Sequence, residues 1–255
     1  MRILLQTLDH GLQYKLAQSL LLGFKNSNYE IKIVELKSAN KKKSFFGKIK
    51  FYYKRQKIRP LIINILSRFF NKKEHKAYSE KTKLIDKLLE KYVVPPDNNL
   101  ITYANDIKEV QSLISKWKPD TVLVIGAPFL PKDYFINGTR YINLHIGKIP
   151  DYRGLKCIEW ALINKDYSSI GYTIHEMTHR LDHGGIYCYE KIDYSNKTLS
   201  EIYAECYTRG IINSIEIALN KKSPIIYKPK YSGKLFYSIN FNNFVIKKVC
   251  EIIDI

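Results

Sequence analysis

The chain of 255 residues contains no run of eighteen apolar residues, so its sequence predicts no membrane-spanning helix. Its opening stretch, Met1 to Thr7, is too short for the apolar part of a signal peptide, and we therefore expect a cytoplasmic location. The four cysteines show no Cys-x-x-Cys spacing, which argues against a disulfide framework and a zinc knuckle. The sequence also lacks a Gly-x-Gly-x-x-Gly motif, so a dinucleotide site is not supported.

Acidic residues are scarce in one part of the chain. The formal net charge is +18, and the segment 41–91 holds seventeen Lys/Arg against four acidic residues, which accounts for +13 of it. The rest of the chain is near balance, so one basic segment causes the imbalance. A solvated helical face is the favoured interpretation of this segment. Attraction of an anionic acceptor, contact with a membrane surface and binding of nucleic acid remain alternatives.

Short apolar runs alternate with segments of helical periodicity, which is typical of an α/β protein with a parallel sheet. Strands are expected at 2–6, 31–36, 100–103, 121–125, 141–145, 171–177 and 186–192. Helices are expected at 11–22, 77–92, 107–117, 156–164 and from a Thr198/Glu201 capping box to about 219, with two short amphipathic helices, broken near Pro60, between 45 and 69. We predict a catalytic domain at 1–220 with a helical insertion at about 41–91, and a small strand-rich appendage at 221–255.

The segment Asn143-Leu-His145 places an amide and an imidazole on the same side of a strand, because side chains alternate faces with a period of two. Asp182 lies in a glycine-containing loop between two predicted strands. These side chains suit carbonyl chemistry: an amide donates to an oxyanion, an imidazole moves a proton, and a carboxylate orients the imidazole. The alternative is structural, with Asn143 ending a strand, His145 buried in the core and Asp182 forming a turn.

Three histidines at four-residue spacing, His175, His179 and His183, would share one face of a helix and could then bind zinc. Because 171–177 alternates as a strand, we predict no metal site and interpret these side chains as surface or rim histidines. His10-Gly11 ends the first strand and opens a helix, where free N–H groups favour an anion such as a phosphate of a substrate. An ordinary strand-to-helix turn is the alternative.

Three motifs in order resemble the 10-formyltetrahydrofolate-dependent formyltransferase family. They are Asn143-Leu-His145-x-x-x-x-Pro150-x-Tyr152-Arg153-Gly154, the stretch from Gly171 to Ile186, and Val124-Ile-Gly126-x-x-Phe129-Leu130-Pro131. The resemblance is strong from about 119 to 219. It implies a Rossmann-like fold and an N-formyltransferase. The family includes glycinamide ribonucleotide, methionyl-tRNA and sugar-nucleotide formyltransferases.

The resemblance also implies roles for individual residues. The acceptor amine would attack the formyl carbon of 10-formyltetrahydrofolate, while Asn143 stabilises the oxyanion, His145 moves the proton and Asp182 orients His145. The cofactor would lie against the backbone of two loops, whose residues are Ala127, Pro128, Phe129, Leu130, Met177 and Leu181. Residues expected to bind the acceptor are His10, Gly147, Lys148, Tyr152 and Arg153.

Two departures from the family pattern affect the fit of the ligands. His183 follows the catalytic aspartate where Thr is common, and Ile146-Gly147-Lys148 replaces a stretch that is commonly richer in Ser and Leu. Neither departure touches the three predicted catalytic positions. Both are expected to alter how the cofactor or the acceptor fits.

The acceptor is inferred by elimination within the family. The residues 221–255 are few for the C-terminal barrel of methionyl-tRNA enzymes, and the insertion does not suit the compact glycinamide ribonucleotide enzymes. A nucleotide-linked amino sugar of surface polysaccharide biosynthesis is therefore the predicted acceptor, with no stable nucleic-acid partner. Transfer to methionyl-tRNA or glycinamide ribonucleotide, and a non-catalytic nucleic-acid-binding protein on the same fold, remain alternatives. A homodimer is also left open.

Overall fold

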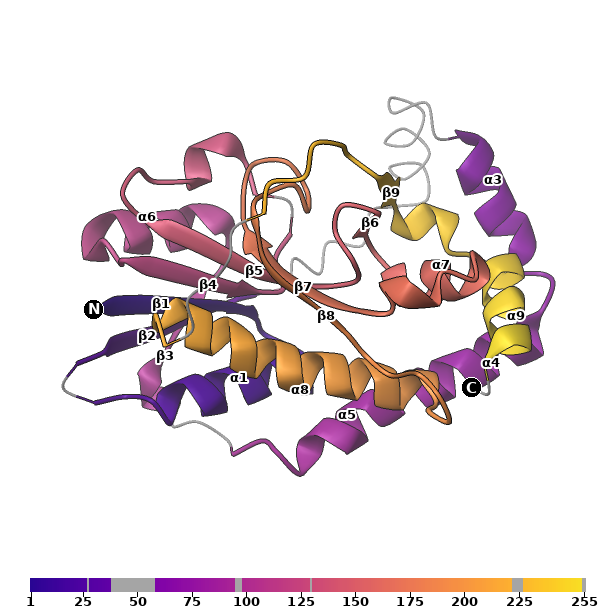
Figure 1. The fold of residues 1–255 in the computed structure, drawn as a ribbon, viewed down its shortest axis with the longest axis horizontal. Coiled ribbons are helices and arrows are strands. Elements are labelled where there is room, and N and C mark those ends of the chain that lie inside the picture. Colours follow the sequence, from indigo (N-terminus) through magenta and orange to yellow (C-terminus); the bar gives the residue numbers. More distant parts are fainter. Residues whose placement is uncertain (27, 38–57, 95–97, 129, 222–226, 254–255) are drawn as a thin grey trace.

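The computed structural model describes residues 1–255 except 27, 38–57, 95–97, 129, 222–226 and 254–255. A seven-stranded sheet runs through its centre in the order β3-β2-β1-β4-β5-β7-β8 (Figure 1). Its strands are β1 (Arg2–Leu8), β2 (Glu30–Leu36), β3 (Ile101–Ala104), β4 (Thr121–Ile125), β5 (Arg140–Ile146), β7 (Gly171–Glu176) and β8 (Ile186–Lys191).

The sheet is mostly parallel, which confirms the predicted α/β architecture. The pairs from β3 to β5 are parallel, whereas β7 pairs antiparallel with both β5 and β8. All residues of β4 are buried, because helices cover both faces of this central strand. Its carboxyl end lies beside that of β5, so polar residues at the end of β5 open onto the edge of the sheet where ligands bind.

Helices form a layer on each face of the sheet (Figure 1). Those of the described residues are α1 (Leu12–Leu22), α3 (Ile58–Ser67), α4 (Lys72–Thr82), α5 (Leu84–Glu90), α6 (Ile107–Trp117), α7 (Cys157–Ile163), α8 (Leu199–Ala218) and α9 (Asn243–Ile252). The long α8 packs against β4, β5 and β7 beside α1, and α6 packs against β2 and β3 on the other face. The predicted capping box is present: the Thr198 hydroxyl accepts from the Glu201 N–H, and the Glu201 carboxylate accepts from the Thr198 N–H.

The insertion differs from its prediction in one place. α3, the second of the two predicted amphipathic helices, begins at Ile58, and Pro60 lies in its first turn, where its missing N–H has no partner to lose. The predicted break before it falls at the edge of the described residues and stays a prediction. The expected helix 77–92 begins already at Lys72 and is divided at Lys83 into α4 and α5. The division lets α4 pack against α9 while α5 packs against α1 and α8. The other amphipathic helix, expected around 45–53, lies outside the described residues.

The prediction of a strand-rich C-terminal part is wrong for the described residues beyond 226. Only the three residues of β9 (Lys234–Phe236) form a strand, which pairs in parallel with β6 (Tyr152–Gly154). The ten-residue α9 follows, and the Asn242 side chain caps it by accepting from two backbone N–H groups. Aromatic residues gave this segment a strand-like composition, but the buried residues of α9, Asn243, Ile246 and Val249, recur at the three-residue spacing of a helix face. α9 packs against α3, α4 and α7, so it joins the insertion to the catalytic domain.

No helix in the described ranges combines the length and the apolar character needed to cross a membrane. α3 and α4 of the insertion lie at one end of the molecule, where they flank α9, whereas α5 runs along α8 (Figure 1).

Candidate active site

The end of β5 carries the two polar residues singled out in the sequence. Asn143 and His145 alternate with buried Ile142 and Leu144, and both polar side chains line the same cavity at the carboxyl edge of the sheet. His145 is only 6% exposed, so its ring nitrogens need partners within the protein.

Those partners fix the orientation of the His145 ring. Its Nε2 lies 2.9 Å from the Tyr152 carbonyl oxygen, and its Nδ1 lies 3.5 Å from Asp182 Oδ2. Gly147 has φ +143°, and a Cβ at this position would lie 2.9 Å from His145 Nε2. A glycine is therefore needed here, because a side chain would crowd the imidazole. Each ring nitrogen thus faces one oxygen atom, and these two contacts hold the plane of the ring.

Asp182 reaches the site from the loop between β7 and β8. It is buried and adopts a left-handed conformation, φ 46°, which aspartate tolerates better than most residues. The Gly154 N–H donates to Asp182 Oδ2 at 2.7 Å. The carboxylate is thus fixed by the backbone of β6 while it faces the imidazole of His145, as an orienting group requires.

His175 is a fourth member of this cluster, and its interpretation as a surface or rim histidine is wrong. Its side chain is 1% exposed, and the register of β5 and β7 places it opposite Asn143. Its Nε2 lies 3.0 Å from Asn143 Nδ2, its Nδ1 lies 2.8 Å from the Glu176 carbonyl oxygen, and Asp182 Oδ1 is 3.7 Å away.

A neutral His175 ring satisfies both hydrogen bonds. Nδ1–H donates to the Glu176 carbonyl, and the unprotonated Nε2 accepts from Asn143. Burial lowers the pKa of His175 to about 4, although the nearby Asp182 opposes the shift. The contact fixes the Asn143 amide with its nitrogen toward His175, which leaves the second N–H of that nitrogen for another acceptor.

A cavity of about 280 Å³, here the first cavity, opens over these side chains. It brings together the three predicted catalytic residues and every described residue that was expected to contact the cofactor: Asn143, His145, Asp182, Ala127, Pro128, Leu130, Met177 and Leu181. Phe129, the remaining expected contact, lies outside the described residues. The roles of these residues stay predictions. The residues come from three separate motifs, and the fold brings them into one cavity.

A second cavity of about 510 Å³ also has His145 in its lining. It shares Gly126, Leu144, His145, Gly154, Leu155 and Ser238 with the first cavity. Its remaining lining comes from α1, β4, the end of β5, the start of α7, α8 and the C-terminal segment: Tyr14, Ile125, Ile146, Lys156, Tyr203, Tyr207 and Phe241. The two cavities therefore adjoin, and His145 belongs to the lining of both.

None of the five residues expected to bind the acceptor is among the lining residues of the second cavity. His10 is exposed, and its ring stands edge-on to the Tyr14 ring with 6.4 Å between the ring centroids. Lys148 Nζ lies 3.4 Å from Asp151 Oδ2. The backbone of Tyr152 bonds to the His145 ring, and Gly147 leaves room for that ring, as described above. The roles of all five residues in binding the acceptor remain predictions.

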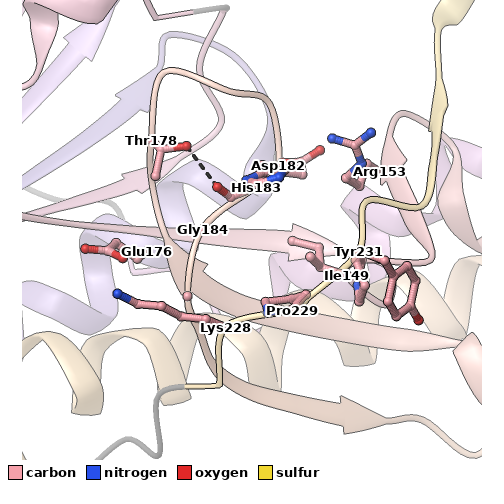
Figure 2. A pocket seen from close by; sticks show the side chains of 12 residues that line it. Ile149, Arg153, Glu176, Thr178, Asp182, His183, Gly184, Lys228, Pro229 and Tyr231 are labelled. Atoms are coloured by element: carbon pink, nitrogen blue, oxygen red, sulfur yellow. Dashed lines mark hydrogen bonds between the residues drawn. The ribbon is translucent and has the colours of Figure 1, made fainter.

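Arg153 instead lines a third cavity of about 310 Å³, on the far side of the Asp182 loop. Figure 2 shows Arg153 beside Asp182 and His183, with Lys228 and Tyr231 of the C-terminal segment opposite. The guanidinium donates to the Gly233 carbonyl at 2.9 Å and to the Leu181 carbonyl at 3.4 Å. Arg153 thus ties the Asp182 loop to the C-terminal segment.

The spacing argument for a histidine metal site does not hold in the structure. β7 ends at Glu176, and His179 and His183 lie in the irregular loop that follows, where the Thr178 hydroxyl donates to the His183 carbonyl (Figure 2). Within the described part of the chain, no three His, Cys, Asp or Glu side chains are grouped as metal ligands.

Several lining residues were missed in the sequence because they come from distant segments. Phe236, Tyr237 and Ser238 of the C-terminal part reach the first cavity, and Tyr203 and Tyr207 of α8 reach the second. The parallel pairing of β9 with β6 places the C-terminal residues there. The four-residue spacing of Tyr203 and Tyr207 puts both rings on one face of a helix, and this is the sequence signal that could have found them.

Comparisons with known proteins match this arrangement to a family. Residues 63–210 match the family described as formyl transferase. The chain is 35% identical over 130 residues to the bifunctional polymyxin resistance protein ArnA of Wigglesworthia glossinidia brevipalpis, covering 49% of this chain and 19% of that protein. It is 30% identical over 129 residues to methionyl-tRNA formyltransferase of Thermosipho africanus, covering 49% of this chain and 42% of that protein. The match spans less than half the length of either relative.

A solved structure extends the likeness over nearly the whole chain. WlaRD, described as a sugar 3N-formyl transferase in the presence of dTDP and 5-N-formyl-THF, aligns with a TM-score of 0.53 and 13% identity. The alignment covers 95% of this chain and 71% of that chain. At this identity the likeness concerns the fold.

Proposed function

Because this chain belongs to the formyl transferase family, we propose that it transfers a formyl group from 10-formyltetrahydrofolate to a primary amine. The observation that carries the proposal is that His145 lines two adjoining cavities, with Asn143 and Asp182 beside it in the first. A donor in the first cavity and an acceptor in the second would meet at the imidazole. Group transfer requires such a meeting point, whereas a binding protein does not.

The first cavity fits the reactive end of a folate. Apolar side chains of Leu130, Met177 and Leu181 can pack against a flat ring, and the backbone of the adjoining loops can supply hydrogen bonds. The cofactor would supply an activated formyl group there. The spare N–H of Asn143 would donate to the formyl oxygen as negative charge develops, because the other N–H is used by His175.

His145 would accept the proton released by the attacking amine. The protonated ring carries a positive charge, which the Asp182 carboxylate and the Tyr152 carbonyl oxygen both stabilise. Asp182 is itself fixed by the Gly154 N–H and needs no rearrangement as the charge forms. Proton transfer of this kind typically accelerates a reaction by roughly 10²–10⁴-fold.

A nucleotide-linked amino sugar is the acceptor that the second cavity supports best. Aromatic rings of Tyr14, Tyr203 and Phe241 suit a sugar or base, and Lys156 supplies a positive charge. WlaRD, which shares the fold, is described with dTDP. We extend the proposal to surface polysaccharide biosynthesis in the cytoplasm, as predicted from the sequence.

The direct test offers 10-formyltetrahydrofolate with dTDP- or UDP-linked 3- and 4-amino sugars, and measures tetrahydrofolate release and the product mass. Methionyl-tRNA and glycinamide ribonucleotide are parallel arms. Formylation of a sugar nucleotide alone supports the proposal, and His145→Asn should abolish it while the circular dichroism spectrum stays unchanged. If no amine is formylated but tRNA binds with a steep salt dependence, the nucleic-acid-binding alternative replaces the enzyme.

The exposed face of α3 supports an additional contact with an anionic membrane surface. Ile62, Leu66 and Phe69 are 50%, 51% and 70% exposed, and the chain has no acidic residue from Lys37 to Lys73. Exposed apolar side chains of α3 and of the turn after it, flanked by cations, suit a lipid headgroup boundary better than nucleic acid. A symmetric dimer through this face would bring two cationic segments together, which is unfavourable.

Sedimentation with vesicles tests this contact. The protein should co-sediment with phosphatidylcholine vesicles that contain phosphatidylglycerol, and should stay in the supernatant with pure phosphatidylcholine vesicles. The double variant Leu66→Ser with Phe69→Ser should no longer co-sediment, whereas Leu84→Ser, at a 45% exposed position on α5, should still do so. A change in sedimentation coefficient on the double substitution, without vesicle binding by the parent, would show a homodimer interface instead.

A further inference from the structure

A fully buried carboxylate lies beneath the second cavity. Glu159 of α7 is 0% exposed, and it accepts hydrogen bonds from the hydroxyls of Tyr78 at 2.5 Å and Tyr203 at 2.6 Å. Tyr78 belongs to α4 of the insertion and Tyr203 to α8 of the catalytic domain. Burial and the neighbouring Glu159 both raise the pKa of each tyrosine, so the two hydroxyls stay protonated and donate.

Lys156 lies between this carboxylate and the second cavity. Its Nζ is 2.8 Å from the Tyr78 hydroxyl oxygen and 3.4 Å from Glu159 Oε1. The same ammonium lies over the rings of Tyr78, Tyr203 and Phe241, at 5.2, 5.8 and 5.6 Å from their centroids. These contacts restrict a long side chain that is otherwise flexible, and reduce the entropy lost when a ligand binds it.

The two charges of this pair differ in their access to the cavity. Glu159 is closed off from solvent and its oxygens receive hydroxyl donors, whereas the Lys156 side chain is 38% exposed and lines the cavity. An ammonium has three N–H donors. One points to Tyr78 and one faces Glu159, so a third remains for a group in the cavity.

We propose that Lys156 determines acceptor specificity by binding a phosphate group of the amine that enters the second cavity, and that the insertion positions Lys156 through Tyr78. The proposal rests on the formyl-transfer function and adds the charge that the acceptor carries. It also gives the insertion a role in the site: without α4, Lys156 would lose its hydrogen-bond partner and one of its three aromatic contacts. Lys156 contacts substrate and is not required for the chemical step at His145.

A purely structural role for Lys156 makes a different prediction. If its ammonium only neutralises buried Glu159, removing it lowers stability and affects all acceptors alike. If it binds phosphate, its removal weakens binding only of phosphate-bearing ligands and reduces the salt dependence of that binding. The two roles are separated by comparing charged and uncharged ligands.

The first experiment measures binding without catalysis, with dTDP and inorganic pyrophosphate as probes in titration calorimetry. Lys156→Met should weaken dTDP binding by roughly 10- to 100-fold, the range expected for one hydrogen bond to a charged group, and Lys156→Arg should retain most of it. Lys197→Met is the matched control, because Lys197 is 30% exposed and also pairs with a glutamate but lies outside the second cavity. Equal dTDP affinity of wild type and Lys156→Met, or no binding of either probe to wild type, overturns the proposal.

The second experiment uses turnover with an accepted amino sugar, with and without its nucleotide diphosphate. Lys156→Met should raise KM for the nucleotide-linked form by a similar factor, with kcat and KM for the free sugar little changed. Tyr78→Phe should raise the same KM by a smaller factor, and its effect should largely vanish in the Lys156→Met background. Equal rises for both acceptor forms would show a structural role. If no amine is formylated but Lys156→Met still loses dTDP, formyl transfer fails and the phosphate site stands.

Discussion

Burial of His175 beside Asn143 makes the stability of the protein depend on pH. The pKa of His175 is about 4 in the folded protein, lowered by burial, against 6.5 for an exposed histidine. Between these values the unfolded chain binds a proton that the folded protein excludes. The free energy of unfolding therefore falls as the pH decreases from about 6.5 towards 4. Above pH 6.5 the ring is neutral in both states, and the protein loses no stability through His175.

The size of this effect follows from the two pKa values. Between pH 7.5 and pH 5 the linkage relation gives a loss of about 2 kcal/mol for this one group, out of about 3 kcal/mol for the whole shift. His175→Gln keeps an acceptor oxygen for Asn143 but cannot titrate. Its free energy of unfolding should thus be about 2 kcal/mol less sensitive to this change of pH than that of the wild type.

Urea denaturation at pH 7.5 and pH 5 measures the difference, and the comparison of the two proteins cancels the titration of carboxylates common to both. The reasoning is refuted if both proteins lose the same stability to within about 0.5 kcal/mol. A second measurement covers a variant that folds poorly: in the wild type, NMR of the His175 ring should show the Nδ1–H tautomer and no titration above pH 6. Titration near pH 6.5 would mean that the ring is not buried as described.

Three further predictions address the site and its support. Asp182→Asn should lower kcat by about 10²-fold or more with little change in the melting temperature, because the amide cannot stabilise charged His145; a kcat near that of the wild type would remove the orienting role of Asp182. Gly154→Ala should destabilise the fold by about 3 kcal/mol or more, since its Cβ would lie 2.1 Å from the Phe236 carbonyl oxygen. Gly138→Ala has a similar φ but open space around it, so it should cost only the backbone strain of roughly 1 kcal/mol. Equal losses in chemical denaturation would contradict a tight β6–β9 contact. Thr198→Ala should cost about 1 kcal/mol through the lost cap, and Thr208→Ala within the same helix should cost less; the reverse order in thermal melts would exclude the capping box as a stabilising element.

The insertion and the C-terminal segment together enclose one side of the site. α9 packs against α3 and α4 of the insertion, and the β9 segment before it pairs with β6, the strand that bears Gly154. Tyr78 from the insertion then contacts Lys156 and Glu159 beneath the second cavity. Two segments that look peripheral in the sequence therefore contribute to the surroundings of the second cavity, where we propose that the acceptor binds.

The sequence by itself determined the features that depend on neighbouring residues. Hydrophobic periodicity located most strands and helices, and the alternation of a strand placed Asn143 and His145 on one side. The capping box fixed the start of α8, because both of its hydrogen bonds join residues three apart. The motifs around β5 and β7 also carried the resemblance to the family that the comparisons confirm.

The tertiary structure decided what depends on residues far apart in the chain. Only the antiparallel register of β5 and β7 buries His175 against Asn143, and only that burial sets its protonation state. Only the packing of α4 and α8 around α7 brings two tyrosine hydroxyls to Glu159 and leaves Lys156 facing a cavity. Local propensity does not encode such contacts, because their energies come from desolvation and from partners that the fold alone brings together.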